Sequence, residues 1–194
     1  MDIKKDVNFL YEIGTLRFVK RTWSQFLTPE FSNVTEHTFR AMWISLVLAK
    51  HEKADSSKVL KIALIHDIPE TRVGDVNYLS KMFTNRDEKK AINEATKDTS
   101  IEEYKELIDE FEKQETIESK IVKDADNLDV DLELAEQYSK GNSLMKDWKD
   151  IRLKVRDKLF TETAKKMFDM IQESNPHEWH LTSSNRFTEG DWKD

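Results

Sequence analysis

The sequence predicts an all-α protein folded as one domain. Its 194 residues contain four glycines and three prolines, whereas a sheet protein of this length needs many turns built from these residue types. Apolar residues account for 38% of the chain and charged residues for 36%, so there is material for a core under a highly charged surface. The length also fits a single domain. A single helical bundle is therefore expected.

Three helices are predicted in the N-terminal third. The first covers roughly residues 5–19, where the apolar positions form an amphipathic pattern. After a loop, Asn33 with Glu36 three residues later is typical of an N-cap with its capping-box partner. The helix that follows is apolar on more than one face, so we expect it to be central. Asp55 begins the third helix, which ends near residues 66–67.

The remainder of the chain predicts one short loop and four more helices. Pro69 and Gly74 bracket the loop. Thr116 is a typical first residue for a longer helix, which Gly141-Asn142 ends, and Asn175-Pro176 stops the last one. The predicted segments are, in order, a loop over 68–75, helices over 87–97, 101–113, 116 to about 140 and about 149–173, and an unassigned tail from 177.

Composition excludes several classes of function. The chain has no cysteine, which excludes disulfides, thiolate zinc sites and a cysteine nucleophile. Its net charge is −7 and its pI is near 5.4, which does not suit non-specific binding to polymeric nucleic acid. A small phosphorylated ligand stays open, because one or two local basic residues can hold it.

The sequence predicts neither a signal peptide nor a membrane span. The N-terminus leads into no long apolar stretch, and no segment approaches the roughly 18 apolar residues that a span needs. We therefore expect no membrane association, and a cytoplasmic location.

The pair His66-Asp67 is the most informative feature of the sequence. It closes an almost unbroken apolar run, residues 59–65, which must be buried. A histidine and an aspartate at the end of such a run are costly to bury unless something binds them. Imidazole and carboxylate side by side are common ligands of a divalent metal, which is the best candidate.

Further ligands are predicted from position along the chain. His37 lies in the first turn of the central helix, whereas His51 sits among charged residues, so His37 is the natural second imidazole. Asp126 has a valine four residues before and after it and so interrupts an apolar stripe. Asp124 and Asp131 look more exposed, and the acidic run 124–136 otherwise reads as a solvated helix face. Asp126 is therefore the expected carboxylate ligand.

A lone histidine, then His-Asp, then a distant aspartate resembles the HD superfamily of metal-dependent phosphohydrolases. Further segments resemble its 5′-deoxynucleotidase branch, over a family-like core of about residues 10–135. A helical C-terminal extension, about 149–194, has no counterpart that we can place in that branch. The segments that carry the resemblance are Thr35-Glu36-His37, His66-Asp67-Ile68-Pro69-Glu70, Gly74-Asp75 and Lys123-Asp124-Ala125-Asp126.

The resemblance implies an HD-domain helical bundle spanning residues 1–194, and often a homodimer. It also implies one set of metal ligands, namely His37, His66, Asp67 and Asp126. Such a set leaves positions open for water and a phosphate oxygen on one divalent transition metal, for which manganese, cobalt, iron, nickel and zinc are all suitable.

The resemblance further implies catalytic roles for Glu70 and Asp75. Glu70 is expected to take the proton of the attacking water or to protonate the leaving oxygen, and Asp75 to orient that water. An anionic substrate also needs cations, for which Arg21, with Lys20 or Arg17, is the choice because the planar fork of arginine grips phosphate. Trp23 is expected to pack against a sugar or base.

The absence of histidines between His66 and His177 favours one metal over two. Binuclear relatives add histidines in that interval, so a phosphomonoesterase is favoured over a diesterase. The expected substrate is a nucleoside 5′-monophosphate, ribo or deoxy. Alternatives are another phosphate ester, a nucleoside triphosphate, or a sensor that binds without hydrolysis. For His177 and His180, packing or a dimer contact is expected rather than a metal pair.

Overall fold

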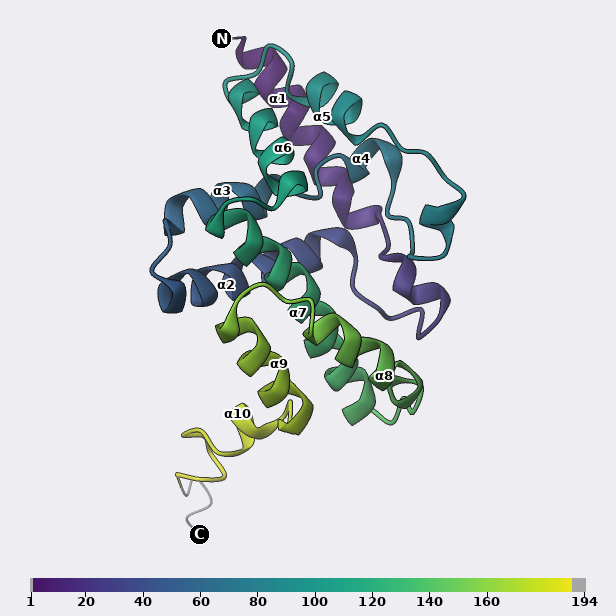
Figure 1. The fold of residues 1–194 in the computed structure, drawn as a ribbon, viewed down its shortest axis with the longest axis vertical. Coiled ribbons are helices and arrows are strands. Elements are labelled where there is room, and N and C mark those ends of the chain that lie inside the picture. Colours follow the sequence, from purple (N-terminus) through teal and green to yellow (C-terminus); the bar gives the residue numbers. More distant parts are fainter. Residues whose placement is uncertain (1, 190–194) are drawn as a thin grey trace.

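The computed structural model describes residues 2–189, and within that range the chain is helical without a β-strand (Figure 1). The all-α prediction is thereby confirmed. No helix among these residues has the length and apolar character that crossing a bilayer requires. The helices are α1 (Ile3–Ile13), α2 (Val34–Glu52), α3 (Ser56–Ile65), α4 (Glu70–Val73), α5 (Glu88–Thr96), α6 (Lys105–Lys113), α7 (Ile117–Ser139), α8 (Met145–Arg156), α9 (Glu162–Glu173) and α10 (Glu178–Leu181), with short 3-10 turns that include η1 (Gly14–Phe18) and η2 (Thr22–Gln25).

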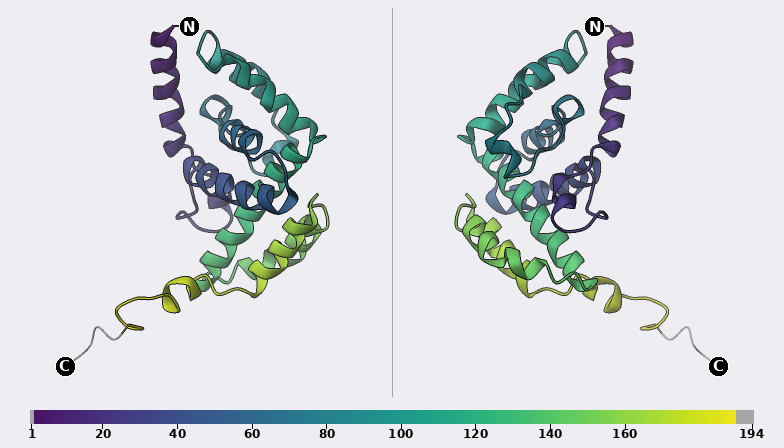
Figure 2. Two further views of the ribbon diagram at one scale, coloured as in Figure 1. Left: turned by 90° about the vertical axis from the view of Figure 1, so that its left-hand side faces the viewer. Right: turned by 90° about the vertical axis from the view of Figure 1, so that its right-hand side faces the viewer.

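Helix α7 runs through the middle of the molecule and packs against α2, α3, α6, α8 and α9. Helices α1, α5 and α6 lie toward one end, and α8 and α9 toward the other. In the side views, the segment after α9 extends away from the bundle (Figure 2). The largest core cluster joins α2, α3, α7 and α9, with Leu48, Val59, Ile121 and Phe168 at most 1% exposed. The helices that carry or precede the predicted metal ligands, α2, α3 and α7, therefore all contribute to the largest buried cluster.

Local capping fixes where the central helices begin. The side chain of Asn33 accepts a hydrogen bond from the Glu36 amide, and the Glu36 carboxylate accepts one from the Asn33 amide, both at 3.0 Å. This capping box satisfies amides that the first helical turn leaves unpaired. The side chains of Asp55 and Thr116 likewise accept hydrogen bonds from amides in the first turns of α3 and α7. The predicted starts of these helices are confirmed.

Three predicted segments differ in detail from the structure. The first helix, predicted over roughly 5–19, ends at Ile13, and the 3-10 turn η1 follows it. The stretch 68–75 is not a loop throughout, because Glu70–Val73 forms the short helix α4. Proline suits the start of a helix since its φ is already helical, and α4 ends at Gly74, whose φ of +70° favours glycine. In the stretch 101–113, α6 begins only at Lys105, after a 3-10 turn.

The helix predicted over 149–173 is two helices, α8 and α9. The break holds no glycine or proline. Instead, the amides of Phe160 and Thr161 each donate a hydrogen bond of 2.8 Å to the carboxylate of Asp124 on α7. The Thr161 hydroxyl donates a third, also 2.8 Å, and accepts one from the Ala164 amide as the N-cap of α9. The carboxylate of Asp124, which lies 36 residues before Phe160 in the chain, thus binds the segment between the end of α8 and the start of α9.

The prediction of a solvated acidic face over 124–136 is wrong. Asp124 and Asp131 are each 1% exposed, contrary to expectation, and Asp129 and Glu133 are buried as well. Arg152 of α8 makes a bidentate pair with Asp131, both bonds 2.7 Å. Later segments pair with Asp124 and Asp131, whereas the earlier residues Ser32 and Arg40 donate to Glu133 and Asp129, and these donors compensate the buried charges.

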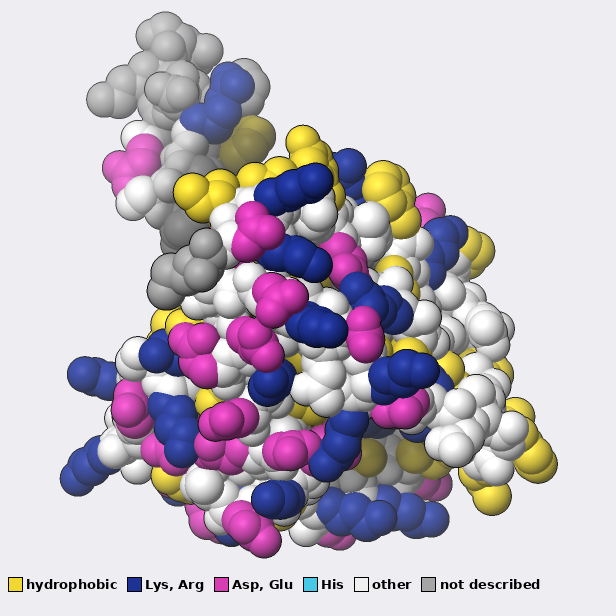
Figure 3. Space-filling model, turned by 90° about the horizontal axis from the view of Figure 1, so that it is seen from above, with side chains coloured by type: hydrophobic (Ala, Val, Ile, Leu, Met, Phe, Trp, Pro, Cys, Tyr) yellow, Lys and Arg dark blue, Asp and Glu magenta, His cyan; other side chains and the backbone are white. Residues whose placement is uncertain are grey.

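The surface seen from the end of α1 and α5 carries acidic and basic side chains interspersed, with apolar side chains toward the rim (Figure 3). No large area of positive charge stands out on that face. Polymeric nucleic acid binds through a continuous basic surface, and this face does not provide one.

Candidate metal centre and active site

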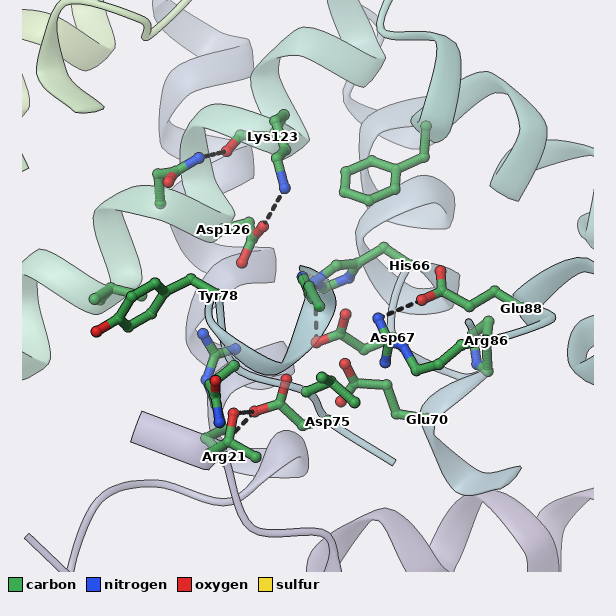
Figure 4. A pocket seen from close by; sticks show the side chains of 18 of the residues that line it. Arg21, His66, Asp67, Glu70, Asp75, Tyr78, Arg86, Glu88, Lys123 and Asp126 are labelled. Carbon is green, nitrogen blue, oxygen red and sulfur yellow. Dashed lines mark hydrogen bonds and ion pairs between the residues drawn. The ribbon is translucent and has the colours of Figure 1, made fainter. Parts of the chain in front are cut away.

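Three helices bring the four predicted metal ligands together. His37 comes from the first turns of α2, His66 and Asp67 follow the last residue of α3, and Asp126 comes from α7. Nε2 of His37 lies 3.3 Å from the Asp126 carboxylate and 3.4 Å from that of Asp67. Nε2 of His66 lies 3.4 Å from the same Asp67 oxygen. The side chains of His66, Asp67 and Asp126 face a common space in Figure 4.

The two imidazole rings are buried, yet their Nε2 atoms lack a hydrogen-bond partner within the described residues 2–189. Burying a polar atom without a partner is costly, so their placement calls for a ligand. His37, His66 and Asp126 each offer a ligand atom within 4.8 Å of the others. Two imidazole nitrogens with two carboxylates form a donor set suited to a divalent transition metal. The residues present therefore fit such an ion.

The other ring nitrogens are held by partners that orient both Nε2 atoms. Nδ1 of His37 lies 2.5 Å from the Asp129 carboxylate, whose second oxygen accepts a 2.5 Å hydrogen bond from Arg40. Nδ1 of His66 lies 2.7 Å from the Ala63 carbonyl. A carbonyl only accepts, so Nδ1 of His66 carries the proton and Nε2 presents its lone pair. Such outer partners typically fix the ring orientation of metal-binding histidines.

The electrostatics of this centre favour positive charge. Burial and Arg21 lower the pKa of His37, but the carboxylates of Asp126, Asp129 and Asp67 outweigh them and raise it to about 9. Side chains of Asp67 and Asp126 are 17% and 22% exposed, so they open toward solvent while the rings do not. The carboxylates thus attract a cation to the space that both Nε2 atoms face.

The centre opens into a cavity of about 1180 Å³ that the predicted catalytic residues also line. Glu70 stands on α4, one turn beyond His66, and Asp75 follows Gly74. Burial, with the charges of Asp67 and Asp75, raises the pKa of Glu70 to about 9. Figure 4 shows both carboxylates beside Asp67. Near neutral pH, Glu70 therefore holds a proton within the cavity.

Asp75 is also a structural link between two segments. One of its oxygens accepts hydrogen bonds from the Thr22 amide at 2.5 Å and the Thr22 hydroxyl at 2.9 Å. Arg86 donates a 2.6 Å hydrogen bond to the carbonyl of Gly74, the preceding residue. The turn that presents Asp75 is thereby pinned from two sides, and the η2 segment is held against it.

Arg21 lies where its predicted role requires a cation. It is 9% exposed and lines the cavity, and its Nε is buried without a hydrogen-bond partner. Burial opposes its charge, but the carboxylates of Asp126, Asp67, Asp129 and Asp75 raise its pKa. Its guanidinium therefore stays charged beside the metal centre (Figure 4).

Trp23 also lines the cavity, within an aromatic cluster. Its ring centroid lies 4.8 Å from that of Trp148, 6.2 Å from Phe31 and 6.3 Å from Tyr78. Sequence reasoning missed Trp148 because the predicted helix started at 149. The spacing of Trp148, Ile151 and Val155 at helical steps could have indicated a shared face.

Two further cations near the site were also missed. Nζ of Lys123 lies 2.9 Å from the Asp126 carboxylate, one turn away on α7. Arg86 also lines the cavity, and its hydrogen bond to the Gly74 carbonyl holds it there. A lysine three residues before a candidate aspartate ligand is a readable i,i+3 pair, whereas Arg86 stands in a polar segment without such a signal.

His177 and His180 lie apart from this centre, at α10. Nδ1 of His177 is 3.3 Å from Nε2 of His180, and Nε2 of His177 is 3.3 Å from the Ser139 hydroxyl. Both side chains are exposed. This contact joins α10 to the end of α7, and it includes no carboxylate.

Comparison with known proteins places the chain in a family. The model of the HD domain matches residues 13–168. The 5′-deoxynucleotidase HDDC2 of Dictyostelium discoideum is 32% identical over 148 residues, which are 69% of this chain and 77% of the relative. The 5′-deoxynucleotidase HDDC2 of Xenopus laevis is 30% identical over 69% of each chain. The 5′-deoxynucleotidase hdd1 of Schizosaccharomyces pombe is 31% identical over 70% of this chain and 74% of its own.

Solved structures share the fold. A conserved hypothetical protein from Pyrococcus furiosus superposes with a TM-score of 0.72 and 26% identity, covering 87% of this chain and 99% of that one. A predicted metal-dependent phosphohydrolase from Magnetospirillum magnetotacticum MS-1 gives a TM-score of 0.70 at 20% identity, over 88% and 91% of the two chains. The chain therefore belongs to the HD domain family and, within it, to the branch of the 5′-deoxynucleotidases.

Proposed function

We propose that this chain is a metal-dependent phosphohydrolase that removes the phosphate from deoxynucleoside 5′-monophosphates. The observation that carries the proposal is the pair of buried Nε2 atoms on His37 and His66, both without partners and both facing carboxylates at a cavity. The relatives named 5′-deoxynucleotidase support the substrate class. The cavity of about 1180 Å³ has room for a nucleotide.

In this proposal one divalent transition metal is held by His37, His66, Asp67 and Asp126. Manganese, cobalt, iron, nickel and zinc all suit this donor set. When bound, such an ion supplies positive charge for the phosphate and acidifies a water molecule. Over residues 2–189, the side chains that could gather around a metal form one group, at this centre. The absence of histidines between His66 and His177 supports a single ion, and with it a phosphomonoesterase.

Glu70 is proposed as the residue that handles the proton. Its pKa of about 9 means that its carboxyl group carries a proton near neutral pH. That proton can pass to the O5′ leaving oxygen as the P–O5′ bond breaks, which avoids expelling an alkoxide. The resulting carboxylate would accept a proton from water for the next turnover.

Arg21 and Asp75 are proposed to position the reacting groups. Arg21 lines the cavity and, among residues 2–189, its Nε has no hydrogen-bond partner, so its guanidinium is proposed to grip the phosphate oxygens. The Asp75 oxygen bound to Thr22 holds the Arg21–Trp23 segment in place, while the carboxylate faces the cavity to orient the attacking water. Trp23, next along that segment, is proposed to pack against the sugar or the base.

The proposal is tested by phosphate release from a panel of ribo- and deoxynucleoside monophosphates. Metal-stripped protein would be resupplied in turn with manganese, cobalt, iron, nickel and zinc. We expect metal-dependent release of orthophosphate and faster turnover of deoxynucleotides. Pyrophosphate release from nucleoside triphosphates would instead indicate a triphosphatase, and metal binding without turnover of any phosphate ester would indicate a sensor.

We also propose that the chain acts as a homodimer in the cytoplasm. The resemblance implies a homodimer, and α2 exposes three large apolar side chains at successive turns. Phe39 is 65% exposed, Trp43 59% and Val47 44%, a stripe of the kind that marks protein interfaces. Sedimentation of the protein with Trp43→Glu would test it, with a monomer expected in place of a dimer.

A further inference from the structure

The end of the cavity reached from Trp23 is walled by aromatic rings from three separate segments. Trp23 belongs to η2, Tyr78 follows α4, and Trp148 stands on α8; all three line the cavity. The Trp148 centroid lies 4.8 Å from that of Trp23 and 5.5 Å from that of Tyr78, both edge-on. Each ring is only partly buried or exposed. The cavity thus ends in an aromatic wall with Trp148 touching both other rings.

Trp148 is held rigidly by the helix that carries it. One face of α8, formed by Trp148, Ile151, Arg152 and Val155, lines the cavity. Arg152, one turn beyond Trp148, is 6% exposed and donates two 2.7 Å hydrogen bonds to Asp131. A further 2.9 Å hydrogen bond reaches a backbone carbonyl of α7. This anchor fixes the turn of α8 that presents the indole ring.

The aromatic wall is continuous with the metal centre. Arg21 and Trp23 are two residues apart, so their Cα atoms are at most about 7 Å apart. Thr22 between them is hydrogen-bonded to Asp75. A phosphate held at Arg21 therefore leaves the rest of a nucleotide within reach of the ring of Trp23 and of Trp148 beside it.

Two polar side chains that line the cavity near these rings, Asn77 and Arg152, are already engaged within the protein. The Asn77 amide donates to Gln25 at 3.1 Å, and its oxygen accepts from the amides of Leu79 and Ser80. Arg152 is occupied by Asp131. The wall therefore offers ring faces to a ligand, and a nucleobase is the part of a nucleotide that binds ring faces.

We propose that Trp148 stacks on the base of the nucleotide and sets the preference of the site for nucleotides over phosphate esters that lack a base. This inference rests on the proposed function and adds a specificity-determining residue from α8. Aromatic stacking on a base is worth a change of roughly tenfold in affinity. The phosphate end of the site does not require this residue.

The first test compares the Trp148→Ala protein with the unaltered protein on two substrates. Deoxyadenosine 5′-monophosphate carries a base, whereas 2-deoxyribose 5-phosphate does not. We expect KM for the nucleotide to rise about tenfold or more, with KM for the sugar phosphate and both kcat values nearly unchanged. Trp148→Phe, which keeps an aromatic face, should restore most of the nucleotide affinity. Trp179→Ala, at a 75% exposed tryptophan on α10, is the matched control and should behave as the unaltered protein.

Two results of this comparison would overturn the inference. If Trp148→Ala raised KM for both substrates by the same factor, the ring would only hold α8 in place. If neither KM changed, the base would bind elsewhere.

A binding measurement separates this inference from the proposed function. Calorimetric titration of deoxyadenosine 5′-monophosphate into Glu70→Gln protein, with and without Trp148→Ala, requires no turnover. A tenfold loss of affinity supports stacking even if no nucleotide is hydrolysed, in which case the proposed function alone fails. Equal affinity of the two proteins would overturn stacking even if the unaltered protein hydrolyses nucleotides.

Discussion

Helix α7 carries two sets of buried polar contacts that differ in whether the chain completes them. Both oxygens of Asp124 accept hydrogen bonds from the break between α8 and α9, and both oxygens of Asp131 accept them from Arg152. Around Asp126, by contrast, the Nε2 atoms of His37 and His66 are buried and unpaired. Near Asp124 and Asp131 the buried polar atoms are hydrogen-bonded within the described part of the chain, whereas near Asp126 two buried ring nitrogens are not.

The difference separates groups that build the fold from groups that await a ligand. An unpaired buried polar atom costs about 1–3 kcal/mol, and completing its partners within the chain removes that cost. At Asp124 the partners belong to a later helix start, so the carboxylate organises the chain. At His37 and His66 the partner is missing, and a cation would supply it. Substitutions in the first region should change stability, and substitutions in the second should change metal binding.

The largest expected effect is the loss of activity in Asp67→Ala. This change removes a carboxylate that lies 3.4 Å from both Nε2 atoms. Metal content should fall from about one per chain to near zero. Turnover should fall at least about a thousandfold, because a catalytic metal contributes several kcal/mol. Elemental analysis and phosphate release measure the two quantities.

We expect Asp67→Ala to leave the fold and the stability of the metal-free protein unchanged. Helical circular dichroism and the urea midpoint of the metal-free protein should stay near those of the unaltered metal-free protein. Retention of one metal per chain by Asp67→Ala would show that the four proposed ligands are wrongly assigned.

Asp124→Ala should produce the opposite pattern. It removes the acceptor of three hydrogen bonds and leaves the part-buried amide of Phe160 and the buried amide of Thr161 without this partner. The expected loss is about 3 kcal/mol of unfolding free energy, measured by urea denaturation. Asp150→Ala, at an exposed position of α8, should stay within about 0.5 kcal/mol.

The metal affinity of the same variant, Asp124→Ala, tests whether Asp124 acts only on stability. Folded Asp124→Ala protein should bind manganese as the unaltered protein does, because Asp124 touches none of the proposed ligands. A large loss of affinity with little loss of stability would mean that Asp124 serves the site rather than the fold.

The sequence indicates the candidate site more directly than it indicates the packing around it. His66-Asp67 is visible because a polar pair closes an apolar run, and Asp126 because it interrupts an apolar stripe. The burial of Asp124 and Asp131 is invisible, since the groups that cover them come from 21 to 37 residues later. Local periodicity carries no information on such contacts, so the missed break between α8 and α9 and the wrong exposures share one cause.

Asp129→Asn tests a carboxylate that belongs to both sets. Asp129 is buried and fully engaged, yet one of its partners is Nδ1 of His37. An amide would hold the ring less firmly and remove negative charge behind it, so metal affinity should fall about 10- to 100-fold. Competition with a chelator measures it. Unchanged affinity would mean that the helix alone orients His37.

The smallest effect is expected where water can replace a lost partner. Glu12 of α1 accepts hydrogen bonds of 2.6 and 2.9 Å from Arg72 of α4, with side-chain exposures of 24% and 39%. Exposed pairs of this kind contribute about 0.2–1 kcal/mol, so Glu12→Gln should lose no more than that at pH 7. Metal affinity should be unaffected.

The pH dependence of this pair distinguishes a real contribution from none. The hydrogen bond from Arg72 lowers the pKa of Glu12 below its ordinary 4.5, although burial opposes it. A depressed carboxyl pKa stabilises the folded state above the unfolded pKa, and the gain disappears as pH falls through the folded value. The difference in unfolding free energy between Glu12→Gln and the unaltered protein should therefore be present at pH 7 and shrink progressively below pH 4.5. A difference that persisted undiminished in acid would assign the effect to packing of the side chain, because only the charged form is favoured by Arg72.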